Sequence, residues 1–312
     1  MHRRYLIINL ILVLLLTVSC GSKHSELPKT SVPPKVTESE PPKLSTTDSI
    51  NHEVVNPPQK ETPENKENSS KTKNEGDSVN LDNSLKRWGF RPNSTHTTPE
   101  VSTAIKEMLK KYSAYYVGDT NSKVLYLTFD EGYEKGYTGK ILDVLKDNDV
   151  KAAFFVTRPY IKTEKDLIRR MVNEGHLVCN HTSHHPSMPS KAGNLDEFKK
   201  EFTETEDIFR EVTGQEMPKY FRPPMGEYSE KSLYLTKELG YKTIFWSFAH
   251  VDWIVDKQPT IQQTHDIVMK RVHNGAILLL HAVSKSNTEA LDLIIKDLKA
   301  EGYRFGTLDE LN

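Results

Sequence analysis

The most constraining feature of this sequence is a buried-strand pattern that ends in two adjacent acids. Residues 124–129 read Val-Leu-Tyr-Leu-Thr-Phe, and Asp130, Glu131 and Gly132 follow directly. An unbroken run of this kind is typical of a parallel strand that is buried on both faces. Two carboxylates cannot stay in such a core, so we expect them at a sheet rim, where α/β proteins bind ligands. The alternative is a strand-ending Asp at a turn, with Glu131 in solvent beside it.

Strand and helix patterns alternate through the rest of the chain. Short apolar runs predict further strands near residues 152–156, 177–180, 219–222, 242–246, 276–280 and 303–307. Amphipathic stretches predict helices at about 136–147, 163–174, 195–212, 229–239, 260–273 and 287–301. Strict alternation indicates a parallel sheet covered by helices, although periodicity does not distinguish an open sheet from a barrel. No Gly-x-Gly-x-x-Gly or Walker loop follows these strands, which argues against nucleotide binding.

The region before the first acidic strand has three parts. Residues 1–20 carry two arginines, a short apolar run and small residues before Cys20, which predicts a signal peptide. The end of this signal resembles a bacterial lipoprotein processing site, so we expect lipidation at Cys20; cleavage without lipidation and an uncleaved anchor are the alternatives. Residues 21–84 are polar and proline-rich, which predicts a disordered linker. Residues 85–312 then form one domain, and its first helix, from about Val101 to Tyr112, is expected to pack on the part of the domain that follows.

Charge and cysteine content exclude two classes of protein. The formal net charge is -1, so no basic excess exists to attract nucleic acid. The chain has only two cysteines, and a lipidated Cys20 would leave Cys179 without an intrachain disulfide partner. Cys179 lies in an apolar run and is expected to be a small buried residue. The alternative, suggested by the nearby His181, is a zinc ligand.

Two histidines have the spacing of a metal site. His181 and His185 follow the strand expected at 177–180 and are separated by four residues. On one helical turn this spacing places both rings on the same face. Imidazole is a good zinc ligand, and one carboxylate would complete a three-ligand site with a position open for water. His184 is one residue off that face and is not expected to be a ligand.

Five motifs occur in a fixed order along the chain. They are Thr128–Gly132, His181–Pro186, Phe221–Gly226, Trp246–Trp253 and Leu278–His281. This ordered set resembles the NodB-type polysaccharide deacetylases, whose first motif usually reads Thr-Phe-Asp-Asp-Gly. The resemblance covers the chain from roughly Leu85 to its end. The Tyr after Gly132, the Ser after Trp246 and the His-Ala-Val-Ser-Lys run are most similar to the δ-lactam-biosynthetic de-N-acetylases, which act on bacterial peptidoglycan.

The resemblance implies a distorted, incomplete (β/α) barrel with a divalent metal ion. Zinc is the expected ion, with cobalt, manganese and magnesium as alternatives. By the same resemblance, Glu131, His181 and His185 would hold it. The family usually has Asp at the position of Glu131, so the longer side chain puts metal affinity and metal identity in question. The alternative is that Glu131 lies behind the site or in solvent.

The resemblance also assigns the catalytic groups that amide hydrolysis needs. Asp130 would take a proton from the attacking water, and Arg222 would pair with this base and orient it. His281 would protonate the departing nitrogen, and Asp252 would hydrogen-bond His281 and keep it cationic. The backbone N–H of Met225 would bind the developing oxyanion. Each residue alone has an ordinary structural interpretation, so the assignment depends on the ordered set.

Several aromatic residues lie close to these motifs. Sugars stack on aromatic faces, so Tyr133, Trp246, Trp253 and Tyr228 are candidates for a glycan-binding groove. The alternative for Trp246 and Trp253 is that they fill the core beneath the site.

We therefore expect an exported hydrolase that removes N-acetyl groups from peptidoglycan amino sugars. The branch resemblance specifies N-acetylmuramic acid, as a step towards the muramic δ-lactam of the spore cortex. Such an enzyme would be a monomer that acts on glycan strands at the outer face of the cytoplasmic membrane, including that of the forespore. The alternatives are an N-acetylglucosamine deacetylase of peptidoglycan or chitin oligomers, and a glycan-binding lipoprotein whose metal site is disabled by Glu131.

Overall fold

The structure, a computed structural model, describes residues 80–311. The expected signal peptide, Cys20 and nearly all of the expected linker lie outside the described residues. The strands are β1 (Lys86–Arg87), β2 (Ala114–Tyr115), β3 (Val124–Glu131), β4 (Ala153–Val156), β5 (Leu177–Asn180), β6 (Tyr220–Phe221), β7 (Glu227–Tyr228), β8 (Lys242–Ile244), β9 (Ile277–His281) and β10 (Arg304–Gly306). The α-helices are α1 (Thr103–Lys111), α2 (Thr138–Asp147), α3 (Arg158–Thr163), α4 (Lys165–Asn173), α5 (Met188–Lys191), α6 (Leu195–Thr213), α7 (Glu230–Glu238), α8 (Ile261–Arg271) and α9 (Lys285–Ala300).

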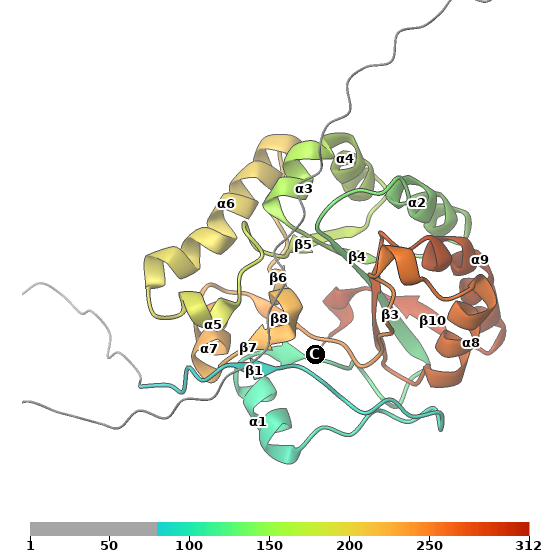
Figure 1. Ribbon diagram of the computed structural model, residues 1–312, viewed down its shortest axis with the longest axis horizontal. Helices are drawn as coiled ribbons and strands as arrows, with labels where there is room; N and C mark the ends of the chain where they lie inside the picture. The colour runs from blue at the N-terminus through green and yellow to red at the C-terminus, as the bar shows by residue number, and fades with distance from the viewer. Residues whose placement is uncertain (1–79, 312) are drawn as a thin grey trace, which may run out of the picture. The chain divides into compact units, whose positions relative to one another are not determined.

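The large sheet is parallel and is organised around β3. One edge of β3 pairs with β4, and the order continues through β5, β6 and β8 to β2. The other edge pairs with β10 near the start of β3 and with β9 over the rest of it. Beyond β8, Phe248 forms a parallel bridge to Leu278 of β9, so the sheet curls back towards β9 and β3. The predicted distorted, incomplete barrel is therefore confirmed, with helices around its outer side (Figure 1).

The two faces of the curled sheet have separate cores. Alternate residues of β3 point in opposite directions because the side-chain period of a strand is two. Leu125, Leu127 and Phe129 pack outward against the helices, together with Phe154 of β4. The inward-facing side chains form a smaller core: Val124, Tyr126, Ala153, Phe155, Cys179, Tyr220, Ile244, Ile277, Leu308 and Leu311. Cys179 is fully buried there, as expected for a small core residue.

Local signals fix the ends of the helices. Asn194 accepts hydrogen bonds from the N–H groups of Asp196 and Glu197 and so caps α6. Gly214 ends the same helix with φ 72°, a left-handed conformation that glycine adopts without strain. The helix expected over residues 163–174 is present as α4, and the short helix α3 that precedes it was not predicted.

The segment before β3 packs on the rest of the domain, as the spacing in residues 101–112 predicted. α1 joins an aromatic cluster in which the rings of Trp88 and Phe245 stack at 4.7 Å. Trp88 Nε1 donates a hydrogen bond to the carbonyl of Trp246 at 2.9 Å. β1 pairs with β7, which continues directly from the turn that contains Met225. No helix in residues 80–311 is long and apolar enough to cross a membrane.

Candidate active site

The expected base and acid stand on neighbouring strands at the same level of the sheet. Asp130 of β3 and His281 of β9 are register partners, and each is the last or next-to-last residue of its strand. Asp130 lies on the inward side, because Leu127 and Phe129 occupy the helix-covered side. The carboxyl ends of parallel strands meet at one rim, so two residues far apart in the sequence share one surface.

Arg222 forms a buried ion pair with Asp130. Arg222 Nη1 donates to Asp130 Oδ1 at 2.7 Å, and the Arg222 side chain is 0% exposed. Its guanidinium lies over the ring of Phe155 at 4.1 Å, and its Nε donates to the carbonyl of Ile244 at 3.1 Å. Burial disfavours a charge on Asp130, but the positive charges of Arg222 and of the facing histidines outweigh it. The pKa of Asp130 therefore lies below its ordinary value.

His281 is held by a buried carboxylate. Its Nδ1 lies 2.7 Å from Asp252 Oδ1, and its backbone N–H donates to Asp252 Oδ2 at 2.9 Å. Since a carboxylate only accepts, Nδ1 carries the proton and Nε2 is the ring nitrogen left to exchange a proton with a substrate. Burial opposes the cation, yet the hydrogen bond and the charge of Asp252 outweigh it. The pKa of His281 is therefore raised.

The histidine pair converges, although not on a helix as predicted. The residues between β5 and α5 form a loop, and the ring centroids of His181 and His185 are 5.0 Å apart. His181 Nδ1 lies 2.8 Å from the carbonyl of Arg222, so Nδ1–H donates and Nε2 carries the free lone pair. That Nε2 is 3.7 Å from Asp130 Oδ2. Burial lowers the pKa of His181 to about 4, which keeps its ring neutral near pH 7.

Glu131 does not join the histidines, and this corrects the ligand set expected from the sequence. β3 continues through Glu131, which pairs in register with Val156 and lies on the helix-covered face. Its side chain is 0% exposed; Oε1 accepts a long hydrogen bond from Thr138 at 3.4 Å, and Oε2 has no partner among the described residues. Burial and the neighbouring carboxylate of Glu134 raise the pKa of Glu131 well above its ordinary value.

The donor set fits a metal ion in part. Neutral imidazoles are ligands for zinc and for similar divalent ions, and the bare Nε2 of His181 is available for one. The carboxylate predicted to accompany the histidines is on the opposite face. Among residues 80–311, no group of three or more His, Cys, Asp or Glu side chains is arranged to hold a metal ion. The arrangement therefore offers two ligands and not the predicted three. His184 bonds Glu201 instead, at 3.1 Å.

Three non-glycine residues at this rim have a left-handed backbone. They are Thr182 with φ 73°, His185 with φ 55° and Met225 with φ 57°. Such conformations are unfavourable for residues with a Cβ and concentrate at functional sites. Met225 belongs to a 3₁₀ turn, Pro224–Gly226, directly after the motif that supplies Arg222. This turn places the Met225 backbone at the rim loops, while its side chain is half-exposed.

The aromatic candidates divide into two groups. Trp253 is 48% exposed, and its ring centroid is 5.5 Å from that of His281, so it belongs to the rim. Tyr133 is also half-exposed, with Lys135 over its ring at 5.6 Å. Trp246 is half-buried beneath the Met225 turn, and Tyr228 is buried against Phe245 at 5.2 Å. Trp253 and Tyr133 can therefore meet a ligand, whereas Tyr228 is a core residue.

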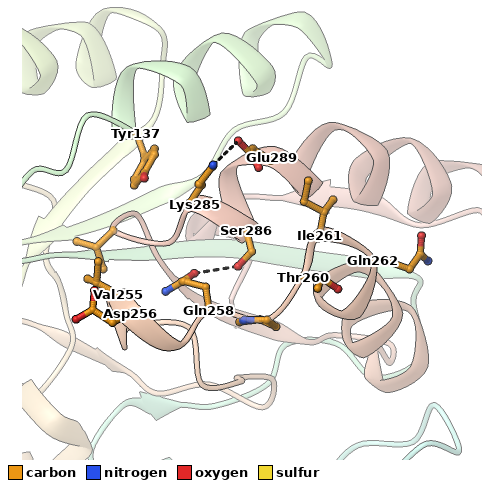
Figure 2. A pocket seen from close by; sticks show the side chains of 12 residues that line it. Tyr137, Val255, Asp256, Gln258, Thr260, Ile261, Gln262, Lys285, Ser286 and Glu289 are labelled. Carbon is orange, nitrogen blue, oxygen red and sulfur yellow. Dashed lines mark hydrogen bonds and ion pairs between the residues drawn. The ribbon is translucent and has the colours of Figure 1, made fainter.

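Two residues that hydrogen-bond Asp252 were not predicted from the sequence. Asn287 donates to Asp252 Oδ2, and Gln258 Nε2 donates to the Asp252 carbonyl at 2.6 Å. The run after His281 predicted only the start of a helix, which begins at Lys285 and not at 287. Gln258 lies in the wall of a groove of about 660 Å³, which is lined by residues 255–256 and 258–262, Tyr137, Val283 and the start of α9 (Figure 2).

Comparisons with known proteins agree with this geometry. Residues 117–244 match the family model described as polysaccharide deacetylase. The chain is 44% identical to the peptidoglycan-N-acetylmuramic acid deacetylase PdaA of Bacillus subtilis, over 72% of this chain and 84% of that protein. It is 34% identical to a peptidoglycan-N-acetylglucosamine deacetylase of Bacillus cereus, over 65% and 73% of the two chains. The solved structure of B. subtilis PdaA, described as a family 4 carbohydrate esterase, has a TM-score of 0.71 and 43% identity and covers 73% of this chain and 97% of its own.

Proposed function

Because this chain belongs to the polysaccharide deacetylase family, we propose that it removes N-acetyl groups from peptidoglycan amino sugars, with N-acetylmuramic acid as its substrate. The observation that carries the proposal is the pairing of Asp130 with His281 on adjacent strands, each held by a buried partner of opposite charge. Amide hydrolysis needs one group that accepts a proton from water and one that gives a proton to the departing nitrogen. These two side chains have those properties.

Asp130 is the base of the proposed reaction. Arg222 keeps its carboxylate ionised and fixes Oδ1, so that Oδ2 is free to accept a proton from the attacking water. Oδ2 is also the oxygen that faces His181. His181 and His185 would hold a divalent cation, zinc first, which would polarise the acetyl carbonyl and make the attacking water more acidic. The backbone N–H of Met225 would donate to the oxyanion.

His281 is the proton donor of the proposed reaction. The nitrogen of a sugar amine is a poor leaving group until it is protonated, because the tetrahedral intermediate otherwise returns to the amide. Asp252 engages Nδ1, so the proton is given from Nε2. The product is a free amine on the sugar and acetate. On muramic acid, this amine can close on the lactyl carboxylate with loss of water, which gives the δ-lactam.

The choice of N-acetylmuramic acid rests on similarity. The relative named for this substrate is 44% identical, whereas the relative named for N-acetylglucosamine is 34% identical. N-acetylglucosamine of peptidoglycan or chitin oligomers is therefore the second candidate. Peptidoglycan lies outside the cytoplasmic membrane, so the signal and Cys20 anchor expected from the sequence suit either substrate. A role in forming the spore cortex would follow from the muramic product.

The proposal is tested with purified protein, zinc and glycan strands whose stem peptides have been removed. We expect acetate release, and mass spectrometry should show muramic residues that have lost acetyl and then water. Asp130→Asn is the control that should release none. Loss of acetyl from glucosamine residues alone would favour the second candidate. If no acetate appears while zinc is bound to the wild type and not to His181→Ala, the deacetylase proposal is wrong. Retained glycan binding without zinc or acetate release would favour a binding lipoprotein.

A further inference from the structure

Asp252, the partner of His281, also accepts a hydrogen bond from a side chain of α9. Asp252 is fully buried, and three donors reach its carboxylate: the backbone and ring N–H groups of His281, and Nδ2 of Asn287. Asn287 lies in the first turn of α9 and is 2% exposed. A hydrogen bond to an ionised group is stronger than one between neutral groups, so this contact restricts how the carboxylate can rotate.

The orientation of the Asn287 amide is dictated by its two neighbours. A carboxylate only accepts, so Nδ2 must face Asp252, and Oδ1 is left as an acceptor on the other side. His250 Nε2 lies 3.0 Å from that Oδ1 and must therefore donate. The remaining ring nitrogen of His250, Nδ1, is buried with no partner in residues 80–311, as suits a ring whose one proton is on Nε2. Burial also lowers the pKa of His250, which favours the neutral ring.

Among the described residues, the Asn287 side chain bonds only Asp252 and His250. The cap of α9 is formed by the Asn287 backbone N–H, which donates to Ser284 Oγ at 3.1 Å. The loop that carries Asp252 is tied to the start of α9 by Gln258, whose Oε1 accepts from Ser284 and Ser286. Figure 2 shows the contact with Ser286. Loop position and carboxylate orientation are thus controlled by different residues, Gln258 for the first and Asn287 for the second.

We propose that Asn287, backed by His250, is a positioning residue for deacetylation: it fixes the Asp252 carboxylate so that Asp252 holds His281 Nδ1–H and leaves Nε2 to protonate the departing nitrogen. This inference rests on the proposed function, because it assigns Asn287 to the proton-donating half of that reaction. The chain of contacts runs from His250 through Asn287 and Asp252 to His281.

The test compares two substrates that differ in their need for a proton donor. Peptide-free glycan strands have an amine leaving group that must be protonated, whereas 4-nitrophenyl acetate has a phenolate that leaves unprotonated. Loss of a hydrogen bond to a charged group should lower kcat/KM of Asn287→Leu on the glycan by about 10- to 100-fold. We define the enzymatic ester rate as the part of 4-nitrophenyl acetate hydrolysis that Asp130→Asn abolishes. In Asn287→Leu this rate should stay within about two-fold of the wild-type rate, since independent steps do not couple. His281→Ala should show the same selectivity, and the double variant should lose little more than His281→Ala alone.

A matched control and a direct measurement separate the possible failures. Thr288→Val removes a buried hydroxyl from the same turn of α9, and that hydroxyl bonds only Ser284 among the described residues; its rates on both substrates should match the wild type. Equal losses on glycan and ester for Asn287→Leu, or losses that add to those of His281→Ala, would overturn the inference. Wild type without glycan activity would instead reject the proposed function. The inference is then decided by ¹⁵N NMR of His281 at a pH above its pKa, where the ring is neutral: a single Nδ1–H tautomer in wild type that becomes mixed in Asn287→Leu supports it, and an unchanged tautomer overturns it.

Discussion

Replacing Glu131 with Gln separates the observed position of this residue from the metal-ligand role that the sequence suggested. In the structure, Glu131 is fully buried on the helix-covered face, with one long hydrogen bond and the carboxylate of Glu134 close by. The Glu131→Gln variant keeps the size and removes the ionisable group. We therefore expect it to be more stable than the wild type at neutral pH, and to bind as much zinc.

The magnitude follows from the raised pKa of Glu131. A group whose folded pKa is raised contributes its full stability below its unfolded pKa, and stability falls as the pH rises towards the folded pKa. The ordinary value is 4.5, so the penalty begins near that pH. It grows by about 1.4 kcal/mol per pH unit while the folded state keeps the proton. At pH 7 the gain from Gln is therefore at most about 3.4 kcal/mol.

The assay is urea unfolding of wild type and variant at several pH values between 4.5 and 8. The difference in unfolding free energy should be near zero at the acid end and should increase with pH. Glu134→Gln is a matched control with the opposite sign. Burial opposes the charge of Glu134, but hydrogen bonds from Thr138, Tyr160 and the backbone outweigh it and lower its pKa. That variant should lose stability above the unfolded pKa of Glu134.

A specific result would refute this reasoning. If Glu131→Gln unfolds with the same pH dependence as the wild type, and loses bound zinc and glycan activity together, then Glu131 occupies the ligand position that the family resemblance implies. Unchanged zinc content measured by elemental analysis, with the pH-dependent gain in stability, supports the placement seen in the structure.

Three further predictions concern Arg222, Asp252 and His181. Arg222→Gln leaves Asp130 buried without its partner, so kcat should fall by about 100-fold or more, and urea unfolding should show a loss of about 3–5 kcal/mol. Asp252→Asn removes the charge that raises the pKa of His281, so the alkaline limb of the pH profile of kcat/KM should move to lower pH, whereas the acid limb set by Asp130 should stay in place. His181→Ala should retain its fold by circular dichroism but bind much less zinc after dialysis, measured by elemental analysis.

Most of the fold could be predicted because its signals are local. Apolar runs and amphipathic stretches located β3, β5 and α6 to within one or two residues. The short strands β1, β2 and β7 have two residues each and give no periodic signal. The helix α3 was also missed, because its six residues are too few for a periodic pattern.

The site was predicted in part. Asp130, Arg222 and His281 lie at or just after strand ends, and Asp252 lies in the loop that follows β8. They converge, as the resemblance implied, because the parallel sheet collects these segments at one rim. The expected role of Glu131 as a metal ligand does not fit its position, and the strand pattern already contained a reason to doubt that role. Neighbouring residues of a strand point to opposite faces, so two consecutive acids share a site only where the strand has already ended. The strand continues through Glu131.

The parallel ladder between β3 and β9 has a consequence for the folding of this protein. Thr128 and Leu278 are hydrogen-bonded across 150 residues of chain. The last pair of register partners in the same ladder, Asp130 and His281, carries the reacting groups. Contacts between residues far apart in the sequence form late in folding, because a long loop must close first. A domain that has assembled only its first strands therefore has Asp130 without its proton donor. The site becomes competent only when β9 has paired with β3, so the reacting groups meet in one of the last steps of folding.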